Sequence, residues 1–214
     1  MAYQNILFDL DGTLTDSKEG ITKAVQYALS KFDIDAPNLD LLESFIGPPL
    51  EVSFKDLYHF SEEDIKKAIS HYRVYFAEQG MYENVLYPGI ENLLKILKGK
   101  GRRIYVATSK PTFFAEQILK HFSIDSYFDG VFGSHLDGRR VDKTEIIAAI
   151  MKERIPTDET VVMIGDRKYD IIGARNNGVD TIAVGYGYGS EDELKICEPN
   201  YFVHNLDELL IFLG

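Results

Sequence analysis

Residues 4–13 read Gln-Asn-Ile-Leu-Phe-Asp-Leu-Asp-Gly-Thr. The apolar run Gln4–Phe8 is followed by two aspartates, Asp9 and Asp11, and then by Gly12. A short apolar run that stops at a turn is typical of a buried parallel strand. Residues two apart in an extended chain share a face, so both carboxylates can point at one bound group, and Gly12 lets the chain turn without a steric penalty from Cβ. The stretch therefore predicts a strand end with two acidic side chains, one suited to act as nucleophile and the other as general acid and base.

Strands and helices alternate along the rest of the chain, apart from one long interruption. The further expected strands are Arg103–Thr108, Gly130–Phe132, Thr160–Ile164, Thr181–Val184 and Tyr201–Val203. The expected helices are Glu91–Gly99, Pro111–Phe122, Thr144–Glu153 and Asp170–Asn177. This alternation predicts an α/β fold, with a Rossmann-like parallel sheet sandwiched between helices.

The interruption is Thr15–Tyr87, which contains no convincing strand. Asp16 followed by Glu19 is a helix-start signal, and apolar residues at helical spacing come after it. The later helices expected in this segment are Leu39–Ile46, Pro49–Phe60 and one that starts at Ser61. The sequence therefore predicts an all-helical domain, residues 15–87, inserted into a core domain formed by residues 1–14 and 88–214.

The composition argues against several classes of protein. The 214 residues include 23 Lys and Arg against 34 Asp and Glu, a formal net charge of −11, and so acidic a chain is a poor nucleic-acid binder. The longest unbroken apolar run, Ile146–Met151, is far shorter than the roughly 18 residues of a membrane span. The first residues lack the features of a signal peptide, and the single cysteine, Cys197, cannot form an internal disulfide. We therefore expect a cytoplasmic protein without nucleic-acid or membrane partners; the sequence indicates no oligomeric state.

Polar residues gather at the carboxyl ends of three expected strands, where ligands bind in open parallel sheets. They are Asp9 and Asp11 after the first strand, Thr108, Ser109 and Lys110 at the end of the second, and Asp166 and Asp170 after Thr160–Ile164. Lys143 opens the helix that precedes this last strand. Four carboxylates in one crevice repel one another and need a cation. Because the oxygen ligands come without a Cys or His cluster, they point to Mg²⁺ rather than zinc.

Four segments resemble, in order, the signatures of the haloacid dehalogenase-like (HAD) hydrolase superfamily. They are Asp9–Asp16 in the form D-x-D-G-T, Thr108 after an apolar strand, Lys143, and Gly165–Asp170. Phe45–Leu50 and Gly133–Gly138 further resemble the branch that contains phosphoglycolate phosphatases and HAD-like 5′-nucleotidases. The resemblance implies the HAD fold, with the helical insertion as the small cap domain of the family.

The resemblance also implies a role for each residue. Asp9 would attack phosphorus to form an aspartyl-phosphate, and Asp11 would protonate the leaving oxygen and then activate the hydrolytic water. Thr108, with the backbone N–H of Ser109, would bind the phosphoryl group, and Lys143 would neutralise it. The implied Mg²⁺ ligands are Asp9, the main-chain carbonyl of Asp11, and Asp166. Asp170 would either bind the ion directly or support one of these ligands.

The leading interpretation is a Mg²⁺-dependent phosphatase that acts on a small phosphorylated metabolite, similar to phosphoglycolate phosphatases or 5′-nucleotidases. A sugar phosphomutase of the β-phosphoglucomutase type uses the same two aspartates and is an alternative. A non-catalytic protein that senses phosphorylated metabolites is an alternative of another class.

Other polar residues near these segments have simpler interpretations. Lys110 and Arg167 are expected to be solvated, although Arg167 is also placed to contact phosphate or to pair with a nearby acid. Asp170 has a second interpretation as the N-cap of its helix, which is compatible with metal binding. Gly185–Gly189 does not follow the pattern G-x-G-x-x-G, so it is expected to be a flexible loop rather than a nucleotide site.

Overall fold

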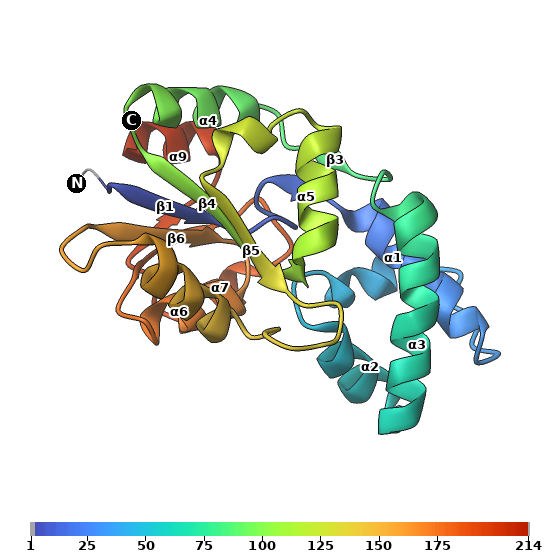
Figure 1. Cartoon of the computed structure of the whole chain (residues 1–214). Coiled ribbons are helices and arrows are strands. Elements are labelled where there is room, and N and C mark those ends of the chain that lie inside the picture. Colours follow the sequence, from blue (N-terminus) through green and yellow to red (C-terminus); the bar gives the residue numbers. More distant parts are fainter. Residues whose placement is uncertain (1–2, 214) are drawn as a thin grey trace. The chain divides into compact units, whose positions relative to one another are not determined.

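A computed structural model describes residues 3–213, which fall into two compact units (Figure 1). The helical unit is Ser17–Val85, and the core unit consists of the residues that precede and follow it. The core unit contains a six-stranded sheet in the order β5-β4-β1-β6-β7-β8, in which every neighbouring pair is parallel. The strands are β1 (Asn5–Phe8), β4 (Arg103–Pro111), β5 (Gly130–Ser134), β6 (Val161–Gly165), β7 (Asp180–Val184) and β8 (Tyr201–Val203). The predicted α/β fold with a parallel sheet is confirmed.

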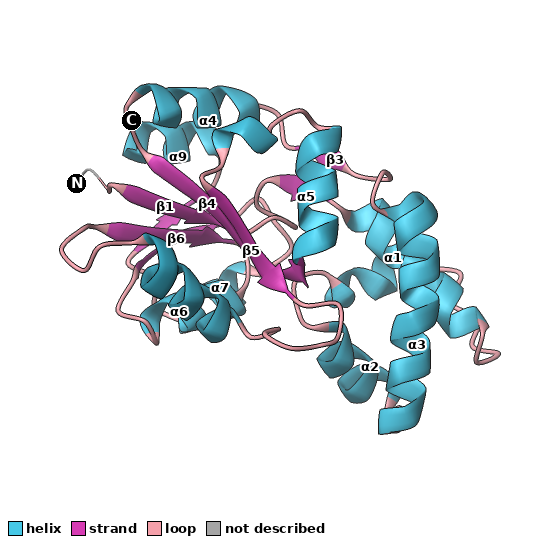
Figure 2. Cartoon of the chain, viewed as in Figure 1, coloured by secondary structure: helices cyan, strands magenta, loops and turns pink. Residues whose placement is uncertain are grey.

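Helices cover both faces of this sheet (Figure 2). On one face, α6 (Lys143–Arg154) and α7 (Lys168–Arg175) bury apolar side chains against Leu7 of β1 and Met163 of β6. On the opposite face lie α4 (Ile90–Gly99) and α9 (Leu206–Leu213), side by side in Figure 1. The other helices of the core unit are α5 (Thr112–His121), η3 (Asp125–Tyr127) and α8 (Glu191–Ile196). We did not predict α9, because its last five residues are all apolar and show no helical periodicity.

The central strand β1 is buried along its whole length and pairs with β4 on one side and β6 on the other. The chain adds β4 and β5 on one side of β1 and then returns to add β6, β7 and β8 on the other. The carboxyl ends of β4, β1 and β6 are therefore neighbours at the point where the strand order reverses. Open α/β sheets bind their ligands at this point.

The structure corrects three expectations about local structure. Thr15–Tyr87 does contain strand residues, because β2 (Thr15–Asp16) and β3 (Val85–Leu86) form a separate two-stranded sheet. Two residues are too few for the alternating pattern that identifies a strand. Asp16 lies in β2 and does not begin a helix; the N-cap residue of α1 (Lys18–Ser30) is Ser17. Finally, β4 continues past its expected end at Thr108, with an irregular register between Ala107 and Pro111.

The helical unit consists of five helical segments. They are α1, η1 (Leu39–Phe45), α2 (Leu50–Tyr58), α3 (Glu62–Tyr75) and η2 (Phe76–Gly80). As predicted, Ser61 begins α3, and its hydroxyl accepts a hydrogen bond from the Asp64 N–H. The expected helix at Leu39–Ile46 is a 3₁₀ helix, which ends before Ile46. α1 and η2 approach so closely that a Cβ at Gly20 would overlap the carbonyl group of Gly80.

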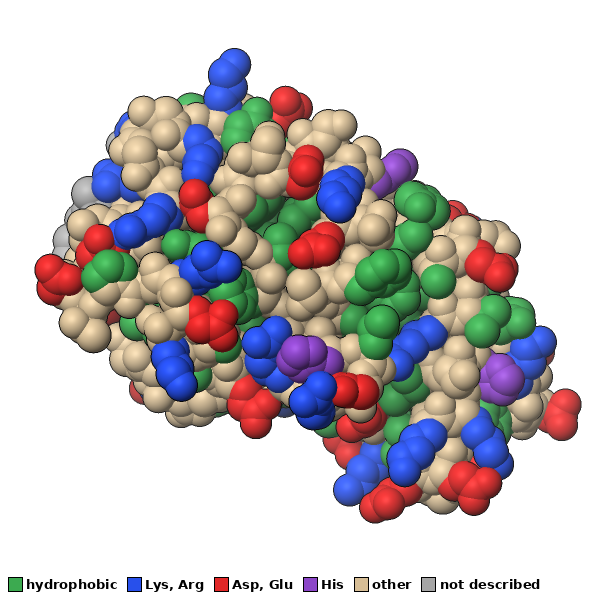
Figure 3. All heavy atoms as spheres, in the orientation of Figure 1, with side chains coloured by type: hydrophobic (Ala, Val, Ile, Leu, Met, Phe, Trp, Pro, Cys, Tyr) green, Lys and Arg blue, Asp and Glu red, His purple; other side chains and the backbone are tan. Residues whose placement is uncertain are grey.

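Within residues 3–213, no helix is both long enough and apolar enough to cross a membrane. Acidic and basic side chains are interspersed over the face of the molecule in Figure 3.

Candidate active site

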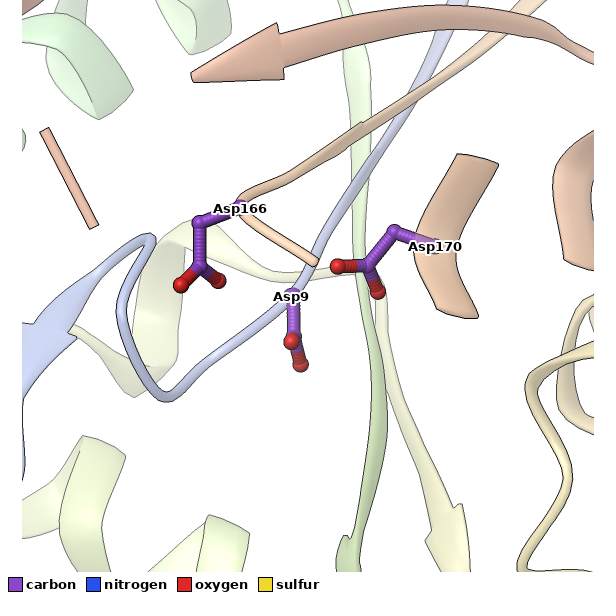
Figure 4. Close-up of side chains that lie close together, drawn as sticks. All are labelled: Asp9, Asp166 and Asp170. Atoms are coloured by element: carbon purple, nitrogen blue, oxygen red, sulfur yellow. The ribbon is translucent and has the colours of Figure 1, made fainter. Parts of the chain in front are cut away.

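Three buried carboxylates lie together at the carboxyl ends of the central strands (Figure 4). Asp9 directly follows β1, Asp166 directly follows β6, and Asp170 lies in the first turn of α7. One oxygen from each side chain lies within 4.8 Å of the others. Three negative charges this close in a buried site repel one another strongly, so the site requires positive charge.

Lys143 supplies one positive charge to this group. Its Nζ lies 2.8 Å from Oδ1 of Asp9 and 2.5 Å from Oδ1 of Asp170, and it donates a hydrogen bond to the carbonyl oxygen of Ala107 at 2.8 Å. Lys143 is the first residue of α6, whose N-cap residue is Asp142. A Cβ at Gly173 would lie 2.7 Å from Cβ of Lys143, so α7 approaches α6 here only because residue 173 is glycine.

Burial and mutual repulsion alter the protonation of the site. Burial raises the pKa of Asp9 from its ordinary value of 3.8 to about 7, although the Lys143 ammonium opposes the shift. The pKa of Asp166 is raised well above its ordinary value, also mainly by burial and then by the charges of Asp9 and Asp170. Burial alone lowers the pKa of Lys143, but the carboxylates of Asp170 and Asp9 outweigh it and raise the pKa overall. One ammonium group therefore does not neutralise the carboxylates fully.

These shifts predict how the stability of metal-free protein depends on pH. Folded Asp9 binds its proton more tightly than unfolded Asp9, so its ionisation destabilises the fold progressively from about pH 4 to about pH 7. The variant Asp9→Asn has a similar shape and no charge to bury. Both proteins are melted in chelator. The melting temperature of Asp9→Asn minus that of the unaltered protein should increase from about pH 4 to about pH 7 and stay constant above about pH 7. A difference that stays constant from pH 4 to pH 8 would contradict the raised pKa.

Asp166 is held by both of its oxygens. The hydroxyl of Thr13 donates to Oδ1 at 3.2 Å, and the backbone N–H of Tyr188 donates to Oδ2 at 2.8 Å. Gly12 has φ of +81°, and a Cβ at this position would overlap the Asp166 carboxylate. The turn after β1 therefore needs glycine both for its backbone conformation and for the space that Asp166 occupies.

Asp11 lies outside the group of three and pairs with a second buried lysine. Nζ of Lys110 lies 2.7 Å from Oδ1 of Asp11, and the side chains are only 7% and 9% exposed. The expectation that Lys110 is solvated is therefore wrong. The strand pattern contained a usable signal, because residues two apart in a strand share a face, and Lys110 stands two residues after Thr108 near the end of β4.

The remaining predicted residues lie close by, with different contacts. Thr108 is buried within the last residues of β4, three before its end, and its hydroxyl accepts a hydrogen bond from the Lys110 N–H. Ser109, the next residue, is half-buried. Asp170 is not the N-cap of α7: Arg167 is, and Oδ2 of Asp170 accepts a hydrogen bond from the Arg167 N–H. Of the interpretations of Arg167, the structure supports an ion pair, because its Nε lies 3.0 Å from Oε1 of Glu193.

Known proteins match this chain over nearly its whole length. The family model described as haloacid dehalogenase-like hydrolase matches residues 6–184. A 5′-nucleotidase of Pseudomonas aeruginosa is 49% identical over 209 residues, which cover 98% of this chain and 95% of that protein. Tyrosine-protein kinase PtkA of Mycobacterium tuberculosis is 37% identical over 213 residues, which cover 99% of this chain and 72% of that protein. The crystal structure of a predicted phosphatase from Clostridium acetobutylicum has a TM-score of 0.96 and 50% identity, and the match covers 100% of this chain and 99% of that one.

Proposed function

Because the chain belongs to the haloacid dehalogenase-like hydrolase family and is a phosphatase, we propose that it hydrolyses small phosphate monoesters with Mg²⁺ and through an aspartyl-phosphate on Asp9. One observation carries the proposal: Asp9 lies in a buried group with Asp166 and Asp170 and contacts Lys143. A nucleophile, a cationic side chain and candidate metal ligands are thereby combined where the central strands end.

The donor atoms fit Mg²⁺. The group Asp9, Asp166 and Asp170 offers only carboxylate oxygens, which are hard ligands, and it is buried with more negative than positive charge. We propose Asp9, Asp166 and the main-chain carbonyl of Asp11 as ligands. Asp170 belongs to the same group, and its two oxygens also accept hydrogen bonds from Lys143 and Arg167. When bound, Mg²⁺ would supply positive charge to the phosphoryl oxygens.

The residues of the chain divide the reaction between them. A carboxylate oxygen of Asp9 attacks phosphorus, the ester P–O bond breaks, and the leaving oxygen takes a proton from Asp11. Water then attacks the phosphorus of the aspartyl-phosphate, Asp11 accepts its proton, and Asp9 is released with inorganic phosphate. Lys143 offsets negative charge on the phosphoryl group, and Thr108 with the Ser109 N–H binds the phosphoryl oxygens. Phosphoryl transfer depends mainly on the positioning of the reacting groups and on the neutralisation of charge, and these side chains supply both.

We propose nucleoside 5′-monophosphates as the first substrates to test, because the 49%-identical relative is named a 5′-nucleotidase. The helical unit is the proposed cap and the source of substrate selection. A panel of nucleoside 5′-monophosphates, phosphoglycolate, sugar phosphates and a phosphotyrosine protein should show faster phosphate release from the small esters than from the protein. Equal rates on the folded phosphoprotein would contradict this assignment.

The same panel tests the mutase alternative. A sugar phosphomutase would move phosphate to another hydroxyl of the sugar, so the products of each sugar phosphate should be separated as well as free phosphate measured. Asp9 and Asp11 are both present and buried in the structure, which disfavours a non-catalytic sensor.

The ion pair between Lys110 and Asp11 leads to a prediction about leaving groups. Lys110 holds one oxygen of Asp11, so Lys110→Met should let the general acid move from its position. We expect kcat/KM for a nucleoside monophosphate, which reports the step that releases the leaving group, to fall about tenfold, a part of the 10²–10⁴-fold that general acid catalysis contributes. For p-nitrophenyl phosphate, whose leaving group needs little protonation, kcat/KM should change much less. Equal losses on both substrates would show that Lys110 does not act through Asp11, and Lys110→Arg serves as the charge-preserving control.

A further inference from the structure

The segment after β7 is packed directly against Asp166. It reads Tyr-Gly-Tyr-Gly at Tyr186–Gly189, and we name it the tyrosine–glycine loop. A Cβ at Gly187 would lie 2.4 Å from Cβ of Asp166, 2.5 Å from its Oδ2 and 2.4 Å from the carbonyl oxygen of Gly12, and a Cβ at Gly189 would overlap the Asp166 carbonyl oxygen. Neither glycine has a positive φ, so other residues could adopt the same backbone. Glycine is required at both positions because Asp166 occupies the space of a side chain, together with the Gly12 carbonyl oxygen at position 187.

The loop also fixes the direction of the Asp166 carboxylate. The backbone N–H of Tyr188 donates to Oδ2, whereas the hydroxyl that donates to Oδ1 comes from Thr13, in the turn after β1. The two oxygens are thus held by two segments that are far apart in the sequence. A carboxylate held at both oxygens keeps its orientation when a ligand is absent.

Two tyrosine hydroxyls anchor the loop to that turn and to β2, which follows it. The hydroxyl of Tyr186 donates to the carbonyl oxygen of Thr13 at 3.0 Å, and the hydroxyl of Tyr188 donates to Oδ1 of Asp16. The ring of Tyr186 also packs edge-on against that of Tyr87, with 5.1 Å between ring centroids. Asp9, Asp11, Thr13 and Asp16 belong to one continuous stretch, so the anchors tie Asp166 to the segment that carries the proposed nucleophile.

We propose that the tyrosine–glycine loop positions Asp166 and thereby sets the affinity of the site for Mg²⁺. The inference rests on the proposed function, in which Asp166 is a metal ligand. Groups that orient metal ligands from behind typically contribute 10–100-fold to metal affinity. The loop residues are positioning residues, since they act through Asp166.

Direct Mg²⁺ binding tests the inference without relying on turnover. Chelator-stripped protein is titrated with Mg²⁺ in a calorimeter for the unaltered chain and for Gly187→Ala, Tyr188→Phe and Asp166→Asn. We expect binding about 10–100-fold weaker for Gly187→Ala and a smaller loss for Tyr188→Phe, which keeps the ring and removes the bond to Asp16. Gly185→Ala is the matched control, because its Cβ would lie against the ring of Phe202 and not against Asp166, and its affinity should stay within about twofold of the unaltered chain.

The outcomes separate the inference from the proposed function. If the unaltered chain does not bind Mg²⁺, or if Asp166→Asn binds as tightly, the assignment of Asp166 as a ligand is wrong. If both of these behave as expected but folded Gly187→Ala and Tyr188→Phe bind like the unaltered chain, the loop does not position Asp166. If Gly187→Ala fails to fold, unchanged binding by Tyr188→Phe overturns the inference alone, and weakened binding supports it.

Discussion

Asp9→Asn should reduce phosphate release by about 10⁴-fold or more, the largest loss that we expect from a single substitution. The amide is nearly isosteric with the carboxylate, but it is not a nucleophile and carries no charge to bind a cation. The contacts that Leu10 N–H and Lys143 make with Oδ1 of Asp9 can both be kept by an amide oxygen, so the local structure should persist. Discontinuous phosphate-release assays with a nucleoside monophosphate at saturating Mg²⁺ measure the loss of activity.

Two further measurements make this result specific. Acid-quenched mixtures of the unaltered chain and labelled substrate should contain phosphate covalently attached to Asp9, and the variant should contain none. Far-ultraviolet circular dichroism and melting in chelator establish that the variant is folded. A folded Asp9→Asn protein that retains a tenth of the activity would exclude an aspartyl-phosphate on this residue.

Ca²⁺ should bind to the proposed metal site and fail to support turnover, with activity at least about 100-fold below that in Mg²⁺. The cluster of Asp9, Asp166 and Asp170 offers only carboxylate oxygens, which also bind larger hard cations. Mg²⁺ requires near-octahedral geometry at about 2.0–2.1 Å, whereas Ca²⁺ accepts 6–8 oxygens at about 2.3–2.6 Å and readily takes both oxygens of a carboxylate. Engaging both oxygens of Asp9 would remove the free oxygen that attacks phosphorus.

The measurement is phosphate release by chelator-stripped protein in Mg²⁺, in Ca²⁺, and in Mg²⁺ with increasing Ca²⁺. Inhibition that rises with Ca²⁺ and is relieved by more Mg²⁺ is the expected pattern. Equal rates in Ca²⁺ alone, or full activity in chelator, would contradict the assignment of Asp9 as both ligand and nucleophile.

The sequence predicted the parallel sheet and the cluster at its strand ends because both depend on short-range patterns. An apolar run followed by Asp-x-Asp-Gly locates a buried strand and its turn, and the alternation of strands with helices indicates that the sheet is parallel. The sheet was predicted from that pattern alone, and the structure brings Asp9, Asp166 and Asp170 together as the convergence of strand ends requires. The roles assigned to these residues remain predictions that the experiments above address.

The contacts missed from the sequence are those fixed by tertiary packing. The strand pattern places Lys110 on the same face as Thr108, but it does not indicate that the Lys110 ammonium will lie beside Asp11, which comes after the end of β1. Tyr186–Gly189 looks like an ordinary loop in the sequence, because the atoms that require its glycines belong to other segments, at Asp166 and Gly12. The sequence also offered Asp170 as the N-cap of α7, because Asp is a common capping residue, but the N-cap is Arg167, three residues earlier. The Asp170 carboxylate instead accepts a hydrogen bond from the Arg167 N–H and pairs with Lys143, which belongs to another helix.

The central place of β1 affects how a newly made chain can assemble. β1 is synthesised before the other strands of the sheet, yet Asn5 pairs with Arg103 on one side and with Val161 on the other, so the strand has no partner in the sheet until β4 has been made. The helical unit, by contrast, is one continuous stretch that is complete before β4 is made. Pairings between distant segments form slowly, because a long loop must close before they contribute stability. The apolar residues of β1 therefore stay exposed throughout synthesis of the helical unit, and Asp9 meets Asp166 only after β6 has been added.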